Sequence, residues 1–315
     1  LPCSTMSSIA ASAATPREGA RVLIAACLAA TWLVWGSTYL AIKWALVSFP
    51  PFFQMGTRFA VAGVLLGAWA WGRGARWPDA RQWTSASVLG LLMLGGGYGL
   101  TAVAAAEVAS GLVVSFIAVV PAMVSLAQLP YGVRPGRAEW AGIALGLAGI
   151  VALSAGQGWS ASTLGLLAIT GACVTWSVGT VWAKHGLPGG RALALAPGAM
   201  GYASQMLAGG AMLVAASALA GEAPHWPTPA SVDVRALACW AYLVVAGSLM
   251  GFTAYMVLLE RAGAALASSY SYVNPVVGMA LGVTLGGEVI SAGEWAAAAV
   301  VLVGVVLLLR GNRPA

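Results

Sequence analysis

The sequence predicts an all-α integral membrane protein with ten transmembrane helices, arranged as two inverted repeats of five. Hydrophobic residues make up 60% of the chain and charged residues only 8%, with a mean hydropathy of +0.87. A soluble domain carries about 25% charged residues. Many charge-free runs reach the roughly 20 residues that a membrane helix needs. A pattern of Trp, Lys, Glu and Pro residues also recurs in the two halves.

The ten predicted spans follow from the positions of the apolar runs, with ends good to a few residues. The second is interrupted only by Arg58, and a single charge-free run over 140–183 holds the fifth and sixth. The spans cover 22–44, 51–72, 84–105, 110–131, 138–155, 162–184, 195–220, 236–259, 265–286 and 292–310. We expect a disordered cytoplasmic tail over 1–21, a first repeat over 22–155 and a second repeat over 162–310.

The repeat is visible in the spacing of a few residues. Trp35 and Lys43 form a W-x8-K pattern that recurs at Trp176 and Lys184. Glutamate, proline and a second glutamate then follow, 14 and 18 residues apart in the first half and 15 and 19 apart in the second. Because each half holds an odd number of helices, the second copy must enter the membrane from the opposite side. Inverted repeats are typical of transporters with a site near the midplane, between the halves.

The basic residues predict the orientation. With a cytoplasmic N-terminus, twelve of the fifteen Lys and Arg residues fall on the inner side, as the positive-inside rule requires. Lys43 and Arg235 fall outside and Arg58 lies within a span. We therefore expect both termini in the cytoplasm. The net charge of +6 reflects this topology, and no nucleic-acid partner is expected because there is no soluble basic face.

Enzymatic signatures are absent from the sequence. The two histidines, His185 and His225, have no second ligand at metal spacing, and there is no Walker A motif. We expect no catalytic residue, no metal and no cofactor. No Asp or Glu lies deep in a predicted span, which favours a neutral or zwitterionic substrate. Proton coupling and facilitated diffusion both remain open.

Aromatic and polar residues inside the spans are the candidates for a substrate cavity. For Trp35 and Trp176, cavity lining and ordinary helix packing are both open interpretations. Around the proline of the ninth span, the sequence is unusually polar and aromatic. The candidate cavity residues are Trp35, Tyr39, Tyr98, Thr101, Trp176, Thr180, Tyr270, Tyr272 and Asn274.

Pro121 and Pro275 occupy equivalent positions in the middle of their spans. Each lacks a backbone donor and is expected to bend its helix. Proline in a membrane helix is often only a tolerated kink, but matched interruptions in two halves mark transporter sites.

Arg58 is the most costly residue in any span. Snorkelling or pairing with a carbonyl is one interpretation, and an anion-attracting group beside the pathway is the other.

Small residues recur at four-residue spacing on the fifth and ninth spans. Gly142 and Gly146 form one G-x-x-x-G pattern, and Gly278, Gly282 and Gly286 form two more. Such stripes allow close helix packing within one chain or across a dimer. A monomer and a homodimer are both compatible with the sequence.

Several of these motifs together resemble the EamA family of the drug/metabolite transporter superfamily. In the first half they are Trp35–Lys43, Pro50-Pro51 and Arg58-Phe59. In the second half they are Leu259–Ala264, Asn274-Pro275-Val276, Gly287-Glu288 and Glu294-Trp295. One departure is Tyr131-Gly132, near the place where the first repeat of the family usually has Gly-Glu.

The resemblance implies ten helices, cytoplasmic termini and a central cavity that alternates its exposure. Members export amino acids and other small metabolites, and the aromatic amino-acid exporters form one branch. We therefore predict a secondary transporter that exports amino acids, aromatic ones included, or related metabolites across a bacterial inner membrane. Its partners would be a small-molecule substrate and the lipid bilayer. The alternatives are a broad-specificity metabolite or drug facilitator and an accessory membrane protein without flux.

Overall fold

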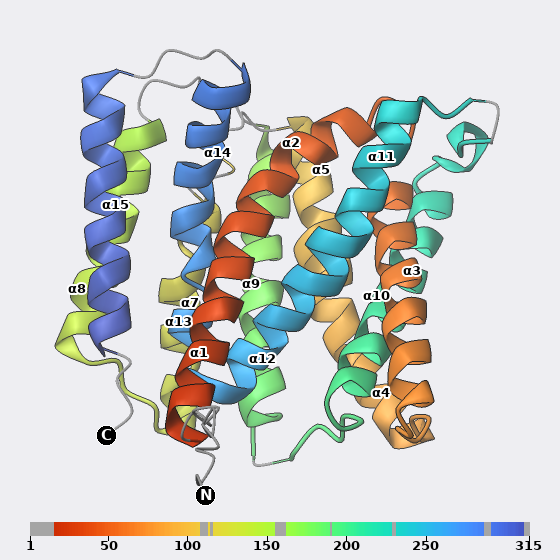
Figure 1. The fold of residues 1–315 in the computed structure, drawn as a ribbon, viewed down its shortest axis with the longest axis horizontal. Helices are drawn as coiled ribbons and strands as arrows, with labels where there is room; N and C mark the ends of the chain where they lie inside the picture. Colours follow the sequence, from red (N-terminus) through yellow and green to blue (C-terminus); the bar gives the residue numbers. More distant parts are fainter. Residues whose placement is uncertain are drawn as a thin grey trace, which may run out of the picture.

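The computed structural model describes residues 16–107, 113, 116–154, 162–189, 191–228, 231–286 and 291–311. Within these residues every regular element is a helix, and β-structure is limited to an isolated antiparallel bridge between Leu187 and Arg191. The helices run side by side along one bundle (Figure 1). The predicted all-α class is confirmed for this part of the chain.

The described first half contains two runs in which helices continue directly into one another, over 16–45 and 80–107. Residue 16 already begins a helix, inside the stretch predicted as a tail, and residues 1–15 lie outside the described part. In chain order the elements are α1 (Pro16–Ala29), the π-helical η1 (Ala30–Val34), α2 (Trp35–Ala45), α3 (Pro51–Gly72), α4 (Ala80–Leu89), the π-helical η2 (Gly90–Gly99), α5 (Leu100–Glu107), α7 (Val120–Ala127), the 3₁₀ turn η3 (Leu129–Tyr131) and α8 (Arg137–Ser154).

The second half opens with a single long helix and contains one run of continuous helices, over 234–261. In chain order its elements are α9 (Thr163–His185), α10 (Ala199–Leu219), the 3₁₀ turn η4 (Ala223–His225), α11 (Val234–Tyr242), the π-helical η5 (Leu243–Phe252), α12 (Thr253–Arg261), α13 (Ala264–Ala267), α14 (Tyr270–Gly286) and α15 (Ala292–Gly311). Six helical stretches meet the length and hydropathy that a membrane span needs, over 19–38, 80–104, 163–185, 199–219, 234–261 and 292–310.

Two π-helical segments occupy equivalent places in the two halves. The separation in sequence between η2 and η5 is the same at their first and last residues. It also equals the separation between Glu107 and Glu260, the glutamates of the repeated pattern. The runs α4–η2–α5 and α11–η5–α12 are therefore counterparts. In Figure 1, the run from α1 to α2 and helix α9 point in opposite directions. π-Helical turns are rare and often lie at functional sites.

The helix ends divide the bundle into two sides. In Figure 1, α1 begins and α15 ends at one end, which we call the terminal end. Helices α3, α9 and α12 also end there, and α8 begins there. These helix ends carry Arg73, Arg137, Lys184 and Arg261 at or next to their boundaries. We call the opposite end, where α2 ends and α3 begins, the distal end.

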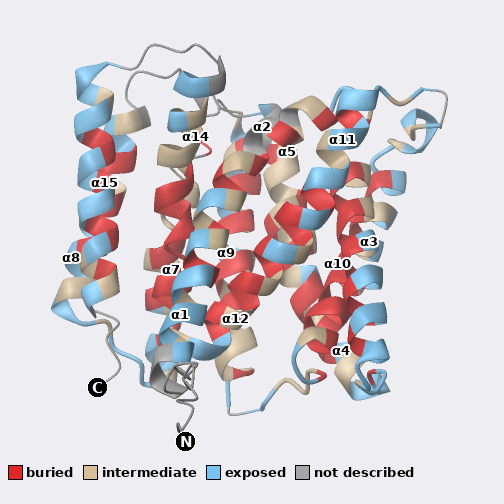
Figure 2. Ribbon diagram, in the orientation of Figure 1, coloured by how far each residue is buried: buried red, intermediate tan, exposed pale blue. Residues whose placement is uncertain are grey.

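Close packing is strongest at the two edges of the bundle, where α8 meets α15 and α3 meets α10. A Cβ atom on Gly142 would lie 2.7 Å from the Gly304 carbonyl oxygen, so the α8–α15 contact requires glycine. By contrast, a Cβ on Gly278 would meet nothing within 4 Å. The stripe predicted on the ninth span does not serve packing within the chain at Gly278. Buried residues concentrate on the central helices, while α15 exposes an outward face (Figure 2).

Side-chain caps fix several helix starts. Asp79 and Gln82 form a reciprocal capping box at α4, and Asp233 accepts from the Ala236 amide at α11. The start of α3 is capped from a distance. Its Phe52 and Phe53 amides donate to the Glu222 carboxylate at 3.2 and 3.0 Å.

Replacing Glu222 with alanine is expected to lower the melting temperature of the purified protein. The carboxylate also accepts from the Ser217 hydroxyl at 2.6 Å, so its loss leaves three donors unpaired. A helix cap of this kind contributes about 1–2 kcal/mol. Thermal unfolding in detergent measures the loss, and Glu222→Gln, which keeps an acceptor but not the charge, should fall between. Equal melting of E222A and the wild type would contradict this role.

Candidate functional site

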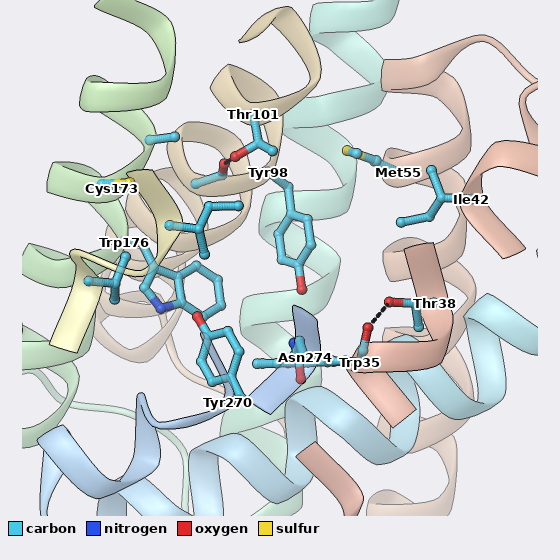
Figure 3. Close-up of a pocket in the computed structure, with 14 residues that line it drawn as sticks. Trp35, Thr38, Ile42, Met55, Tyr98, Thr101, Cys173, Trp176, Tyr270 and Asn274 are labelled. Carbon is cyan, nitrogen blue, oxygen red and sulfur yellow. Dashed lines mark hydrogen bonds between the residues drawn. The ribbon is translucent and has the colours of Figure 1, made fainter. Parts of the chain in front are cut away.

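A cavity of about 130 Å³ lies between the two halves. Six of the predicted cavity residues line it: Trp35, Tyr98, Thr101, Trp176, Tyr270 and Asn274. Residues that the sequence did not single out complete the wall: Thr38, Ile42, Met55, Gly97, Ile117, Val120, Ala172 and Cys173. None of the described lining residues is charged. Figure 3 shows the labelled side chains converging from α2, α3, η2, α5, α9 and α14.

A cluster of four aromatic rings lies at one end of this cavity, and three of them, Trp35, Trp176 and Tyr270, line its wall. Trp35, Trp176, Tyr255 and Tyr270 contact one another in every pairing, with ring centroids 4.6 to 6.3 Å apart. Most of these pairs are edge-on or tilted, which the ring quadrupoles favour. We call these four residues the aromatic cluster. Its two tryptophans are those of the repeated W-x8-K pattern, one from each half, and its two tyrosines both come from the second half.

Each tryptophan of the repeated motif fits against the π-helical segment of the other half. Trp35, from the first half, donates its indole N–H to the Gly247 carbonyl of η5 at 2.9 Å. A methyl group on Gly251 would collide with the same indole. Trp176, from the second half, covers Gly97 of η2, where a Cβ would lie 2.8 Å from Cε3. The two halves are therefore interlocked through reciprocal tryptophan–glycine contacts.

Asn274 joins α14 to the first helix run. With the amide turned so that its nitrogen faces acceptors, it donates to the Trp32 and Tyr270 carbonyls, each at 3.1 Å. Trp32 in turn donates its indole N–H to the Ser269 hydroxyl at 3.0 Å. Asn274 is 2% exposed, so these bonds satisfy a polar group that burial would otherwise penalise.

Tyr98 stands between the cavity and Arg58. Its ring contacts Trp176 on one side, with centroids 5.7 Å apart, and the Arg58 guanidinium on the other, 5.2 Å from Cζ. The guanidinium also lies 4.9 Å from the Phe59 ring centroid. Figure 3 shows the Tyr98 phenol projecting into the middle of the lining residues.

Arg58 is 2% exposed, so it does not snorkel to water. Its Nε and Nη1 atoms have no hydrogen-bond acceptor in the described structure, and no described carboxylate pairs with it. A desolvated cation–π contact contributes about 2 kcal/mol. A charged side chain at the centre of a membrane helix costs about 3 kcal/mol on insertion scales and several times more in simulations. The two ring contacts together are comparable to the cost on insertion scales and offset only part of the cost found in simulations.

The remaining predicted site residues lie elsewhere. Thr180 shares a 2.6 Å hydrogen bond with the Tyr255 hydroxyl, one turn below Trp176 on α9. Tyr272 points away from the cavity, against Gly146 and the Ile143 carbonyl of α8. Tyr39 belongs to α2, but its side chain lies outside the described part of the structure.

The two prolines differ in their local structure. Pro121 sits in the first turn of α7, just after a turn at residues 118–119. Pro275 lies inside α14, and the break in its span comes earlier, at the turn of residues 268–269. Both spans are interrupted, yet only Pro121 lies at the interruption.

Lys184 ties α9 to the junction of α12 and α13 at the terminal end. Its ammonium group donates to the Leu259 carbonyl at 2.9 Å and also to the Ala262 carbonyl. Nearby, Tyr131, from the departure noted in the first repeat, donates its hydroxyl to the Gly186 carbonyl at 2.9 Å. The side chain of Lys43, the counterpart of Lys184, is outside the described part.

The cavity extends from the aromatic cluster towards the distal end. Ile42, Met55 and Thr101 lie on the side away from Trp35 and Tyr270 (Figure 3), on helix segments that reach the distal end (Figure 1). Below the cluster, α9 carries Thr180 and then Lys184, each bonded to α12 or its end. Successive contacts therefore close the cavity towards the terminal end.

Tyr255 is the functional candidate that sequence reasoning missed. A tyrosine hydroxyl about one turn from the end of the apolar eighth span was the available signal, because a buried hydroxyl needs a partner. Within the described residues, no three His, Cys, Asp or Glu side chains lie close enough to hold a metal ion.

Comparison with known proteins decides the class. The model of the EamA-like transporter family matches residues 21–155 and again residues 163–310. The chain belongs to the EamA-like transporter family. This EamA-family chain is similar over 286 residues, at 38% identity and 90% of each chain, to YedA of Escherichia coli K12, named as an uncharacterized inner membrane transporter. YvbV of Bacillus subtilis, named as an uncharacterized transporter, is 29% identical over 154 residues, 48% of this chain and 50% of YvbV.

A protein of known crystal structure shares the fold of this EamA-family member. The TM-score is 0.74 at 23% identity, covering 95% of this chain and all of the other. The family match and the Escherichia coli relative show a membrane transporter of the drug/metabolite type, which acts on small molecules across a lipid bilayer.

Proposed function

We propose that this transporter exports amino acids or related small metabolites, with a preference for aromatic ones, across a bacterial inner membrane by alternating access. The observation that carries the proposal is the aromatic cluster at one end of the cavity between the halves. Trp and Tyr rings offer faces and edges to an aromatic or apolar group of the substrate. The name of the Escherichia coli relative supports the membrane assignment.

The proposed architecture is ten transmembrane helices in two inverted repeats, over 22–155 and 162–310. The matched π-helical segments and the double family match support a duplicated unit. The opposed directions of the α1–α2 run and α9 support inversion. The basic helix ends at the terminal end support cytoplasmic termini under the positive-inside rule.

With that orientation, the conformation has its cavity extended towards the outside and closed towards the cytoplasm. The contacts at Thr180 and Lys184 would then have to loosen for loading from inside. An exporter visits both states, and the release state is the one that faces outward.

The size and chemistry of the cavity favour small metabolites over bulky drugs. Its 130 Å³ holds roughly ten water molecules, which corresponds to a ligand with a similar number of non-hydrogen atoms. Without an acidic lining residue in the described wall, a cationic drug would find no counter-ion there.

The test is transport by purified protein in proteoliposomes. Saturable flux is expected for phenylalanine, tyrosine or tryptophan, with weaker flux for aliphatic amino acids. Flux should fall at least about tenfold in Trp176→Ala, because the substrate loses an aromatic wall worth about 1.5 kcal/mol or more.

Empty liposomes and Trp71→Ala, at an exposed ring away from the cavity, are the controls. Absence of saturable flux for every amino acid would refute the substrate class. Repeating the assay with and without a pH gradient separates proton coupling from facilitated diffusion.

A further inference from the structure

The strongest unassigned feature is the buried positive charge beside the cavity. Arg58 extends from α3 to the far side of the Tyr98 ring, 5.2 Å from its centroid. Tyr98 lines the cavity and Arg58 does not. A single aromatic ring therefore separates a buried guanidinium from the proposed substrate space.

The Arg58 guanidinium lacks hydrogen-bond acceptors at two of its nitrogens in this conformation. Its Nε and Nη1 atoms lack acceptors in the described structure. A carboxylate binds a guanidinium at two points through Nη2 and one of these two nitrogens. Nη2 carries two N–H groups, so a two-point contact with an incoming carboxylate needs only one of them together with the unpaired Nε or Nη1.

Two carboxylates at the ends of the helices that carry Arg58 and Tyr98 already have hydrogen-bond partners. Glu222, at the start of α3, accepts from two backbone amides and from Ser217. Glu107, at the end of α5, accepts from the Ser162 hydroxyl at 2.7 Å. The counter-ion for Arg58 is therefore absent from the described protein, which leaves a bound ligand to supply it.

The backbone at Tyr98 suits a ring that moves. Tyr98 lies in the last turn of the π-helical η2, with glycine on both sides at Gly97 and Gly99. Beside Tyr98, the aromatic cluster presents Trp176 and Tyr270 to the same cavity, and the Trp176 ring centroid lies 5.7 Å from that of Tyr98. A molecule with a carboxylate at one end and an apolar ring at the other matches these two groups.

We propose that Arg58 is a carboxylate-binding subsite of the cavity, reached when the Tyr98 ring turns aside, and that the substrate is a small carboxylate with an aromatic or apolar body. The inference rests on the proposed function for its transport step, but carboxylate binding can be measured without flux. The Tyr98 ring covers the Arg58 guanidinium when the cavity is empty, and it turns aside when the carboxylate of the ligand binds.

Binding to the purified transporter in detergent tests the subsite. The probes are 3-phenylpropionate and its neutral isostere 3-phenylpropionamide, titrated by calorimetry. The wild type should bind the acid at least about tenfold more tightly. In Arg58→Gln the two affinities should become equal, while the affinity for the amide stays unchanged. A wild type without preference, or an R58Q that keeps it, would overturn the proposal.

A second measurement needs no substitution, in case R58Q does not fold. Phenylglyoxal modifies arginine, and peptide mass spectrometry reports each site. The acid should protect Arg58 at least about tenfold better than the amide, in line with the affinities. The exposed Arg76 should react equally under all conditions. An Arg58 that never reacts, or reacts without protection, contradicts the subsite.

Flux and binding together separate the two proposals. Acid-selective binding that depends on Arg58, without flux, would refute the transport proposal and keep the subsite. Flux of amino acids and their amides at equal rates would keep the transport proposal and refute the subsite. A wild type that neither binds nor transports these probes would refute both.

Discussion

Replacing Gly251 with alanine is expected to reduce transport by more than tenfold and to lower the melting temperature. The added methyl group would occupy the position of the Trp35 indole nitrogen. Trp35 must then leave the Gly247 carbonyl, which removes a buried hydrogen bond of 2.9 Å. Overpacking costs about 1–3 kcal/mol, and unpairing a buried donor and acceptor costs a similar amount. Flux per folded protein, measured beside thermal unfolding, checks the result.

Gly97→Ala is the matching variant in the other half, and Gly67→Ala is the control. Gly97→Ala should impair transport as well, because its methyl group would press on Trp176 at 2.8 Å. Gly67→Ala places a methyl in ordinary contact, 3.6 Å from Ala203, and should leave transport intact while favouring the helix. Normal flux in both G251A and G97A would show that the reciprocal contacts are dispensable.

Replacing Lys184 with methionine is expected to have the second large effect. The ammonium group binds two carbonyls where α12 ends, and a helix C-terminus attracts a cation. Methionine keeps the apolar stem but leaves both carbonyls without this donor, at a cost of about 1–3 kcal/mol. We expect a lower melting temperature and several-fold slower transport. Both follow from loosening the contact that holds α9 against α12 and α13.

Arg191→Gln is the matched control for Lys184→Met. Arg191 is exposed and lies a few residues after the end of α9. Its replacement by glutamine removes one positive charge, as K184M does. Its variant should melt and transport as the wild type does. If K184M also behaves as the wild type, the hydrogen bonds of Lys184 at the terminal end contribute to neither stability nor transport.

The helical class and many helix ends were predictable, because both depend on composition and on local signals. The predicted span over 51–72 coincides with α3, which begins with proline at its first position. The π-helical segments were not predictable, since no residue preference marks them. Two of them, η2 and η5, hold the glycines that contact Trp176 and Trp35 from the other half of the chain.

The cavity residues show the same limit. Tyr270 and Tyr272 are two positions apart on one helix, and so point in nearly opposite directions. The sequence marks both as candidates, but only packing against Gly146 assigns Tyr272 to the α8 side. Thr180 lies one turn from Trp176 on α9, but its hydroxyl is hydrogen-bonded to Tyr255 and it does not line the cavity. Tyr255 comes from a span whose partners the sequence does not reveal.

The reciprocal tryptophan–glycine contacts between the halves have a consequence for how the protein assembles in the membrane. A first half made alone would have no η5 to receive Trp35, and a second half alone would have no η2 beneath Trp176. Each would keep an empty slot where a tryptophan belongs, and a missing large aromatic costs about 3–5 kcal/mol. During synthesis we therefore expect the first half to stay incompletely packed in the membrane until the second half has been translated and inserted. Assembly of the transporter is a late event that joins two halves, rather than the growth of one finished half onto another.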